Sequence, residues 1–295
     1  MIDPVSLFLM LLSASTPILF AALGEMIAER AGVLNLGVEG MMIVGALAGF
    51  ATAYATGNPI AGFLVAALAG AAVSLLFAML TQFFLANQVA SGLALTLFGL
   101  GLAALFGKPF EGIKAPAMIA GPLGINWIVW LGLAMVPVLW WFLNRSRAGL
   151  ILRAVGENHD AAHALGYNVR LVRIAAIAFG GAMAGIGGAF VSIVTVLQWS
   201  EGMTAGAGWI ALAIVVFSRW TPIGVLAGAW LFGGVTVLQL RMQAAGIGVP
   251  VQLLSMAPYL ATIIVLVLIS ARQKFSRQAG GSAPGSLGQN FFAMR

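Results

Sequence analysis

The chain has 295 residues, of which 61% are hydrophobic and only 7% are charged, and its mean hydropathy is +1.05. A soluble domain carries about 25% charged residues, so this composition excludes an ordinary soluble protein and indicates a chain embedded in lipid. The absence of cysteine excludes disulfides and thiol catalysis. The net charge of +6 is interpreted as a signal of membrane topology and not of nucleic-acid binding.

Apolar runs bounded by Gly, Pro or charged residues predict the membrane-spanning helices, since roughly 20 apolar residues cross a bilayer. In chain order the runs are 6–23, 41–54, 60–84, 89–106, 125–143, 174–197, 207–217, 223–240 and 251–269. The predicted fold class is therefore all-α, a polytopic transmembrane helix bundle of about nine spans. Residues 1–270 are predicted to form one transmembrane domain with no sizeable soluble domain beside it.

Basic residues predict the orientation of this bundle. If the C-terminal tail is cytoplasmic, only Lys108, Lys114 and Arg241 lie outside and the other basic residues lie inside. The positive-inside rule then places the N-terminus outside and the C-terminus inside. Two inner segments are long, namely the loop 144–173 and the tail 271–295. The tail contains the polar, Gly-rich run GGSAPGSLGQ and is predicted to be disordered.

Two stretches of the sequence are similar to each other. Glu39–Met41 precedes a short apolar segment that ends before Pro59, and Glu201–Met203 precedes another that ends before Pro222. On the predicted topology the first copy begins inside and the second outside, as an inverted-topology repeat with broken helices requires. The alternative is chance similarity within an apolar sequence, and the residues alone leave both interpretations open.

The inner loop 144–173 is predicted to contain a short helix. Asn158 suits the N-cap, Asp160 suits the positive end of the helix dipole, and Gly166 suits the stop. The small apolar residues between them would fit the groove of a partner protein, whereas a solvated loop is the alternative. His159 and His163 have the spacing of zinc helices, but no third ligand lies near them, and no metal site is predicted.

Several segments resemble one family of membrane proteins. The run GENHDAAHALG contains Asp160-Ala161-Ala162-x-x-x-Gly166, which is similar to the EAA-x-x-x-G coupling loop of ATP-binding-cassette (ABC) importer permeases. The segments ERAGVLNLGVEGMMIVGA, EGMTAGAGWIALAIVVFSRWTPIG and PYL (residues 258–260) resemble the nucleoside and simple-sugar branch of the branched-chain amino acid, sugar and nucleoside permease family. The similarity covers most of the chain and keeps its order.

This resemblance implies the permease subunit of an ABC importer in the bacterial inner membrane, translocating a small neutral solute such as a nucleoside or simple sugar. It implies no enzymatic activity and no cofactor in this chain, because ATP and Mg²⁺ bind to a separate ATPase subunit. The other implied partners are a second, related permease chain, an extracytoplasmic substrate-binding protein and the lipid bilayer, without nucleic acid. The residues expected to couple to the ATPase are Arg153, Glu157, Asn158, Asp160, Ala161, Ala162, Leu165 and Gly166.

The broken segments predict where the solute pathway lies. Residues 30–39 are too polar to face lipid, and a short span that follows Glu39 or Glu201 would present free backbone N–H groups to a solute. The candidate pathway residues are Asn35, Glu39, Asn87, Gln88, Ser91, Glu201 and Trp209. Structural roles are the alternatives: helix caps for the two glutamates, an amide-capped turn at residues 87–88, and an interfacial position for Trp209.

Two other functions remain open at this stage. One is a branched-chain amino acid ABC permease, because the N-termini of half-helices would accept a solute carboxylate. The other is a secondary transporter coupled to H⁺ or Na⁺, which needs an ionisable residue in the middle of a span. None of the eight acidic residues lies in the middle of a predicted span, which disfavours ion coupling.

Overall fold

The computed structural model describes residues 4–118, 121–246 and 283–292, together with Met256, Leu260, Ile263, Ile264 and Val267. Within these residues the regular elements are helices, joined by loops that contain two isolated bridges between residues 111–114 and 198–199. Seven of the helices found there are long and apolar enough to cross a membrane. The all-α transmembrane fold class is confirmed.

Ten α-helices are described. They are α1 (Pro4–Arg30), α2 (Val38–Thr56), α3 (Pro59–Ala78), α4 (Gln88–Gly107), α5 (Trp127–Arg145), α6 (Arg147–Glu157), α7 (His159–Ala164), α8 (Val169–Phe190), α9 (Ala207–Phe217) and α10 (Pro222–Ala244). Single π-helical turns extend α3 through Met79–Phe83 and α8 through Val191–Thr195, and short 3₁₀ turns lie at Lys108–Phe110 and Pro122–Gly124.

Polar residues mark where most of these helices begin. The side chains of Asn58, Asn87, Asn126, Ser146, Asn158, Asn168 and Thr221 each accept a hydrogen bond from a first-turn backbone N–H. Such caps satisfy backbone donors that have no partner within the helix. Helices α2 and α9 differ, because they follow Gly37 and Gly206 and have no side-chain cap at the N-cap position.

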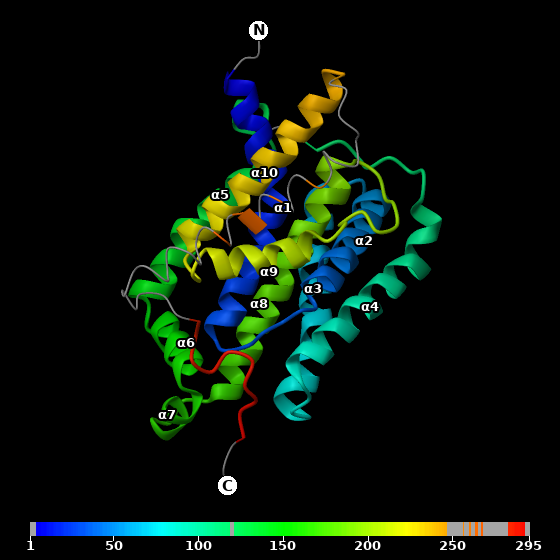
Figure 1. Cartoon of the computed structure of the whole chain (residues 1–295). Coiled ribbons are helices and arrows are strands. Elements are labelled where there is room, and N and C mark those ends of the chain that lie inside the picture. Colours follow the sequence, from blue (N-terminus) through cyan, green and yellow to red (C-terminus); the bar gives the residue numbers. More distant parts are fainter. Residues whose placement is uncertain are drawn as a thin grey trace.

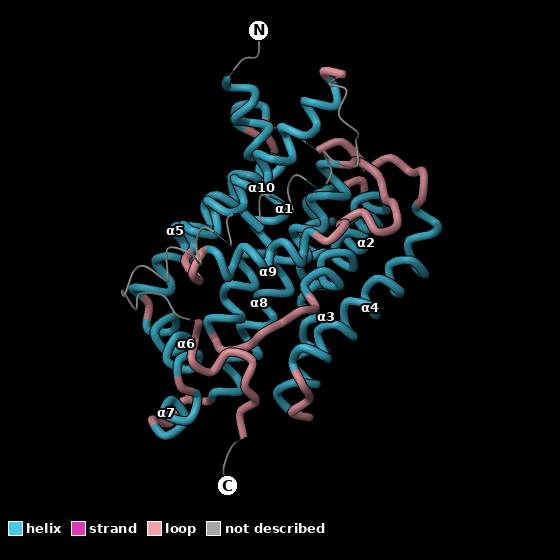
Figure 2. Tube along the Cα trace, in the orientation of Figure 1, coloured by secondary structure: helices cyan, strands magenta, loops and turns pink. Residues whose placement is uncertain are grey.

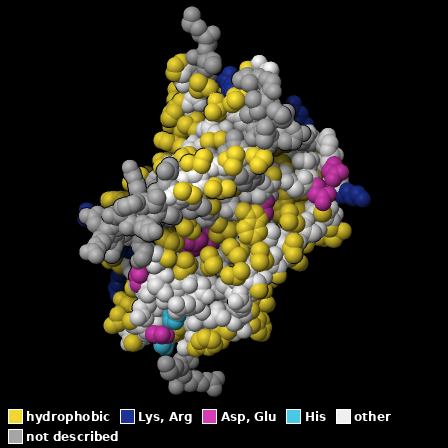
Figure 3. Space-filling view, viewed as in Figure 1, with side chains coloured by type: hydrophobic (Ala, Val, Ile, Leu, Met, Phe, Trp, Pro, Cys, Tyr) yellow, Lys and Arg dark blue, Asp and Glu magenta, His cyan; other side chains and the backbone are white. Residues whose placement is uncertain are grey.

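Helix α8 lies at the centre of the bundle, against α1, α2 and α3 (Figure 1). Glycines allow this close approach: a Cβ atom added to Gly188 would lie 1.9 Å from the carbonyl oxygen of Met42, and one added to Gly185 would lie 2.1 Å from that of Ala66. Lipid provides little hydrophobic drive between helices, so their association depends on such close backbone packing. Hydrophobic side chains remain widespread on the surface (Figure 3).

Different elements lie at the two ends of the molecule. The N-terminal end of α1 and the C-terminal end of α10 lie at one end, whereas α6, α7 and residues 283–292 lie at the other (Figure 1). Helix α9 lies crosswise to the long helices in the middle of the molecule (Figure 2). The loop before α2 and the loop before α9 approach this middle region from opposite ends (Figure 1).

Three predicted spans need comment. The run 207–217 does form a helix, but its 11 residues extend only about 17 Å at 1.5 Å per residue and cannot cross a bilayer. The first helix continues to Arg30 and not only to Leu23, so Glu25 and Glu29 lie inside it and are buried. The ninth predicted span, 251–269, lies outside the described residues except at five isolated positions.

Candidate functional site

The N-termini of α2 and α9 meet at one carboxylate. Glu39, in the first turn of α2, accepts hydrogen bonds from the Thr204 hydroxyl at 2.5 Å, from the Gly206 N–H at 3.1 Å and from the Gly208 N–H at 2.7 Å. Only 4% of Glu39 is exposed. The negative charge therefore satisfies donors at the positive end of the α9 dipole and replaces the side-chain cap that α9 lacks. A Cβ atom added to Gly208 would lie 2.5 Å from the Glu39 nitrogen, so this contact needs glycine.

A second buried carboxylate holds the loop before α2. The backbone N–H of Asn35 donates to Glu25 of α1 at 3.1 Å, while the Asn35 side-chain oxygen accepts from the Gly37 N–H at 2.9 Å. From α4, the Gln88 side-chain oxygen accepts from the Leu34 N–H at 2.8 Å. The loop between α1 and α2 is thus anchored by three polar side chains, and two of them, Asn35 and Gln88, were predicted pathway residues.

A third carboxylate holds the other end of α9. The indole N–H of Trp220 donates to Glu29 at 2.5 Å, and the Arg30 Nε donates to the Trp220 carbonyl oxygen at 3.0 Å. Arg219 and Trp220 have positive φ angles of 53° and 55°, a strained conformation for residues with side chains. The end of α1 therefore stabilises the strained turn after α9. Together the three carboxylates form what we call the α2–α9 junction: Glu25, Glu29, Glu39 and their partners Asn35, Thr204, Gly206, Gly208 and Trp220.

The remaining pathway candidates take other positions. Ser91 is buried in the first turn of α4, and Asn87 is exposed and caps that helix through the Ala90 N–H at 3.0 Å, which is the structural alternative predicted for it. Glu201 is exposed and does not join the carboxylate contacts of the junction, and Trp209 is 38% exposed on α9. The structure thus places Asn35 and Gln88 at the loop before α2 and Glu39 at the start of α9, and leaves Asn87 and Glu201 outside these contacts.

Glu25, Glu29, Thr204 and Trp220 were not predicted. Glu25 and Glu29 are four residues apart at the end of an apolar run, a spacing that puts both on one helix face, and this signal was available in the sequence. Ending the first span at Leu23 left them outside the membrane. Helix α1 therefore carries two buried acidic residues near its C-terminal end, and the expectation that none lies in the middle of a span stays a prediction.

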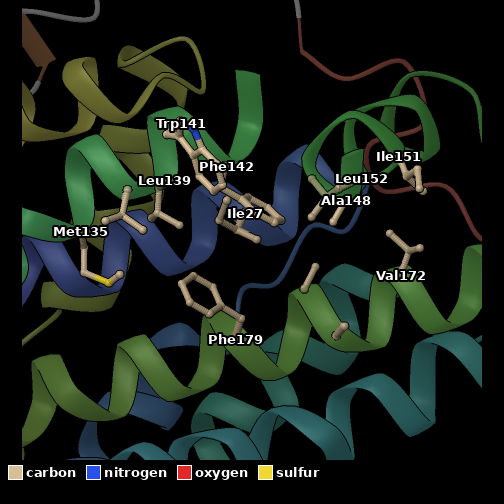
Figure 4. A pocket seen from close by; sticks show the side chains of 13 residues that line it. Ile27, Met135, Leu139, Trp141, Phe142, Ala148, Ile151, Leu152, Val172 and Phe179 are labelled. Carbon is tan, nitrogen blue, oxygen red and sulfur yellow. The ribbon is translucent and has the colours of Figure 1, made fainter. Parts of the chain in front are cut away.

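One cavity of the described bundle is apolar. It has a volume of about 490 Å³ and lies between α1, α5, α6 and α8 (Figure 4). Its lining includes Ile27, Leu139, Phe142, Leu152 and Phe179, and no predicted pathway residue. Apart from the Trp141 indole N–H and the weakly accepting Met135 thioether, the lining side chains have no hydrogen-bonding group, so a polar solute would leave most of its polar atoms unpaired and this cavity is not the candidate site.

The short helix predicted in the inner loop is α7. The Asn158 side chain caps it by accepting from the Ala161 N–H at 2.9 Å, and Gly166 follows it with a φ of +88°. Asp160, Ala161 and Leu165 are exposed, whereas Ala162 is buried. These exposed side chains form the outer face of α7.

Residues 283–292 of the tail pack against α7. The Phe291 ring, 4% exposed, contacts the rings of His159 and His163 edge-on at centroid distances of 5.5 and 5.2 Å. Ser286 donates its N–H to the Gly156 carbonyl oxygen at 2.8 Å and accepts from the His159 N–H at 3.2 Å. The predicted disorder is therefore corrected for residues 283–292, because a buried aromatic ring and backbone hydrogen bonds offset the cost of ordering them.

Arg173 connects this tail to the loop before α2. Its guanidinium is fully buried and donates to the carbonyl oxygens of Ala31 at 3.2 Å and Gln289 at 2.9 Å, and its Nη2 lies 3.2 Å from the Nδ1 of His159. A further contact joins the tail to the segment before α4, where the Asn290 side chain donates to the Leu85 carbonyl oxygen. Of the other residues expected to couple, Glu157 is exposed at the end of α6, whereas Arg153 lines a cavity shared with α1, α5 and α10 and is not part of α7.

We expect Glu39→Gln to destabilise the protein by about 1–3 kcal/mol, because an amide offers one acceptor where two N–H groups and a hydroxyl now bind a carboxylate. Thermal unfolding of the purified protein in detergent measures the loss. The matched control is Glu201→Gln, the same change at an exposed position, for which a change below about 0.5 kcal/mol is expected. Equal effects of the two substitutions would contradict the role of Glu39.

We expect Phe291→Ala to loosen α7, because the ring packs edge-on against both histidines of that helix. Amide hydrogen exchange of residues 159–166 should become faster, while exchange in α8 stays unchanged. Phe292→Ala is the matched control, since the neighbouring ring is 64% exposed. Unchanged exchange in the Phe291 variant would show that the tail does not support α7.

The packing of α7 is also expected to depend on pH. Burial lowers the pKa of His159 below its ordinary value, and the charge of Arg173 lowers it further, while Asp160 at 3.6 Å raises it. Because the folded protein disfavours the proton, stability is complete above the unfolded pKa of about 6.5 and falls as the pH drops below it, by at most about 1.4 kcal/mol per pH unit. Hydrogen exchange of α7 between pH 7.5 and 5.5 measures this, and His159→Gln should abolish the dependence.

Comparison with known proteins agrees with these features. Residues 7–271 match the family described as the permease component of the branched-chain amino acid transport system. A putative glucose ABC transporter permease of Haloferax volcanii is 41% identical, covering 92% of this chain and 93% of the relative. A nucleoside ABC transporter permease of Lactococcus lactis is 34% identical (86% and 89% covered), and a guanosine ABC transporter permease of Bacillus subtilis is 31% identical (85% and 88% covered). The chain therefore belongs to this family of multi-pass membrane permeases of ABC transporters.

Proposed function

We propose that this permease imports a neutral solute, a nucleoside or a simple sugar, as the transmembrane part of an ABC importer. The observation that carries the preference is the occupied N-terminus of α9. The first-turn N–H groups that would hold the carboxylate of an amino acid already bind Glu39. Two further acidic side chains, Glu25 and Glu29, are buried in the same junction, which therefore offers no additional cation to pair with a solute carboxylate. Sugar and nucleoside permeases among the relatives support the same choice.

Among the predicted pathway residues, Trp209, Ser91 and Glu201 are proposed to contact the solute directly. Trp209 is half-exposed on α9 and offers a flat ring, on which a sugar ring or a nucleobase would stack. Asn35, Glu39 and Gln88 act indirectly, because their polar atoms hold the loop before α2 and the start of α9. Asn87 is proposed to cap α4 at the inner mouth of the pathway.

The end of the molecule that carries α6, α7 and residues 283–292 is proposed to be cytoplasmic. This orientation rests on the positive-inside rule, because Arg145, Arg147, Arg170 and Arg173 belong to this end of the bundle. The C-terminus is then cytoplasmic, and residues 1–270 contain the transmembrane permease domain of a bacterial inner-membrane protein. The N-terminus and the α10 end face the outside, where an extracytoplasmic binding protein would deliver the solute.

The outer face of α7 is proposed to receive the ATPase subunit, which binds ATP and Mg²⁺. Asp160, Ala161 and Leu165 are exposed there, and Gly166 ends the helix. Asn158 and Ala162 act indirectly, because Asn158 caps α7 and Ala162 is buried on its opposite side. Glu157 lies beside this face. Arg153 is not proposed to contact the ATPase subunit, because it lies in α6 and lines a cavity there. A second, related permease chain is proposed to complete the transporter.

We expect Ala161→Trp to lower uptake at least tenfold while the permease still inserts into the membrane, because a bulky ring on the outer face of α7 would obstruct docking. Uptake and ATP hydrolysis are measured with the complete set of subunits in vesicles. Ala161→Ser is the control, since it keeps a small side chain at the same exposed position. Uptake by the Trp variant at the unmodified rate would contradict docking on α7.

We expect vesicles with the complete transporter to accumulate a labelled nucleoside or glucose in an ATP-dependent manner, and not leucine. The three solutes are compared at equal concentration, with a matched transporter lacking ATPase activity as the control. Because the N-terminus of α9 is occupied by Glu39, leucine has no partner for its carboxylate there. Uptake of leucine alone would overturn the proposed solute class.

A further inference from the structure

A second cavity lies at the inner end of the bundle and contains no predicted pathway residue. It has a volume of about 330 Å³ and lies where the ends of α1 and α5 meet α6 and the start of α10. Its lining includes Arg30, Trp140, Asn144, Arg153, Thr221 and Ile223. This volume lies within the range of small-molecule pockets, and the lining combines two cations with apolar surface.

The two arginines of this cavity are not neutralised. Arg30 uses its Nε for the Trp220 carbonyl oxygen, and the Nε of Arg153 is buried without a hydrogen-bond partner. The two guanidinium groups are close enough to repel each other. Glu157 is close enough to attract Arg30, yet no ion pair joins either arginine to a carboxylate within the described residues. Two partly buried cations in this arrangement are stabilised by an anion between them.

The start of α10 adds to the positive potential of the cavity. Thr221 is the N-cap residue and accepts from the Gly224 N–H, while Pro222 and Ile223 follow in the first turn. Pro222 has no N–H and the Gly224 N–H is bound by Thr221, so it is the helix dipole that favours a negative charge at this end. Because Thr221 to Ile223 line the same cavity as the two arginines, all three positive elements converge on one volume.

The depth of the cavity indicates the source of the anion. The membrane-spanning helix α5 ends at Arg145, and Trp140 near that end is exposed, as is typical of an interfacial tryptophan. Ile223, at another wall of the cavity, is 63% exposed. The cavity therefore opens at the level of the lipid headgroups and has an exposed apolar rim, which the glycerol and acyl parts of a lipid would cover and a free phosphate ion would not.

We propose that this basic cavity binds the phosphate group of an anionic phospholipid from the leaflet on the α7 side. The guanidinium groups of Arg30 and Arg153 donate to the phosphate oxygens, a pairing for which their planar, multi-donor geometry is suited. The lipid thereby ties the end of α1 to α6, beside the Trp220 turn that closes α9. The site is distinct from the solute pathway and from the outer face of α7.

The test uses the full-length chain with its partner subunits in detergent. Native mass spectrometry and thermal unfolding are recorded with added phosphatidylglycerol, phosphatidylcholine or inorganic phosphate. The unmodified protein should retain phosphatidylglycerol and be stabilised by it, and Arg153→Gln should weaken this binding about tenfold or more, the loss expected for one hydrogen bond to a charged group. Arg153→Lys, which keeps the charge, should retain part of the affinity.

Arg147→Gln is the matched control, because it removes an exposed arginine from the same helix, and its affinity should stay within twofold of the unmodified protein. Thermal unfolding without added lipid checks that each variant is folded. Equal phosphatidylglycerol binding by the Arg153→Gln and Arg147→Gln variants would overturn the proposal. So would protection by inorganic phosphate as strong as that by the lipid, or loss of the ATPase subunit from the Arg153→Gln complex with lipid binding unchanged.

Discussion

The contact between Glu39 and the start of α9 is the constraint on which the middle of this protein depends. A helix that begins in the interior of a membrane protein, away from water, leaves its first N–H groups without partners unless other protein groups meet them. One carboxylate meets the donors of α9, and Asn35 meets the donor of Gly37 before α2. The starts of α2 and α9 are therefore fixed against each other, and any displacement of one must break or carry along the contact with the other.

The long helices could be predicted from the sequence because each is an apolar run of sufficient length. The positions at which these helices begin and end were harder to predict. The first helix runs beyond Leu23 because Glu25 and Glu29 find donors in Asn35 and Trp220, which are distant contacts that hydropathy does not register. Likewise the run 207–217 has the hydropathy of a span but forms half of one, since its start is fixed by Glu39, a residue 168 positions earlier than Ala207.

The candidate site was predicted in part for the same reason. Glu39 was found from its position before a short apolar segment, but its partners Thr204 and Gly206 lie in a loop whose path depends on the fold. The tail shows the opposite error. Its Gly-rich composition predicted disorder, whereas Ser286 and Phe291 find partners on α7 that composition cannot reveal. The local sequence pattern indicates which residues are candidates for the site. Their hydrogen-bond and packing partners lie in remote segments, and only the fold brings these segments together.

Arg173 joins the α7 end of the bundle to the loop before α2. It contacts His159 of α7, Gln289 of the tail and Ala31 in the loop that leads to α2. A continuous set of contacts thus runs from the outer face of α7, through one buried guanidinium, to the loop whose far end bears Glu39. Lysine would not reproduce this arrangement, because three partners in different directions require the fixed, forked donors of arginine. A movement of α7 that displaces Arg173 would first change the contact with the Ala31 carbonyl oxygen. The loop before α2, which Glu25 and Gln88 hold, would then have to shift as a unit.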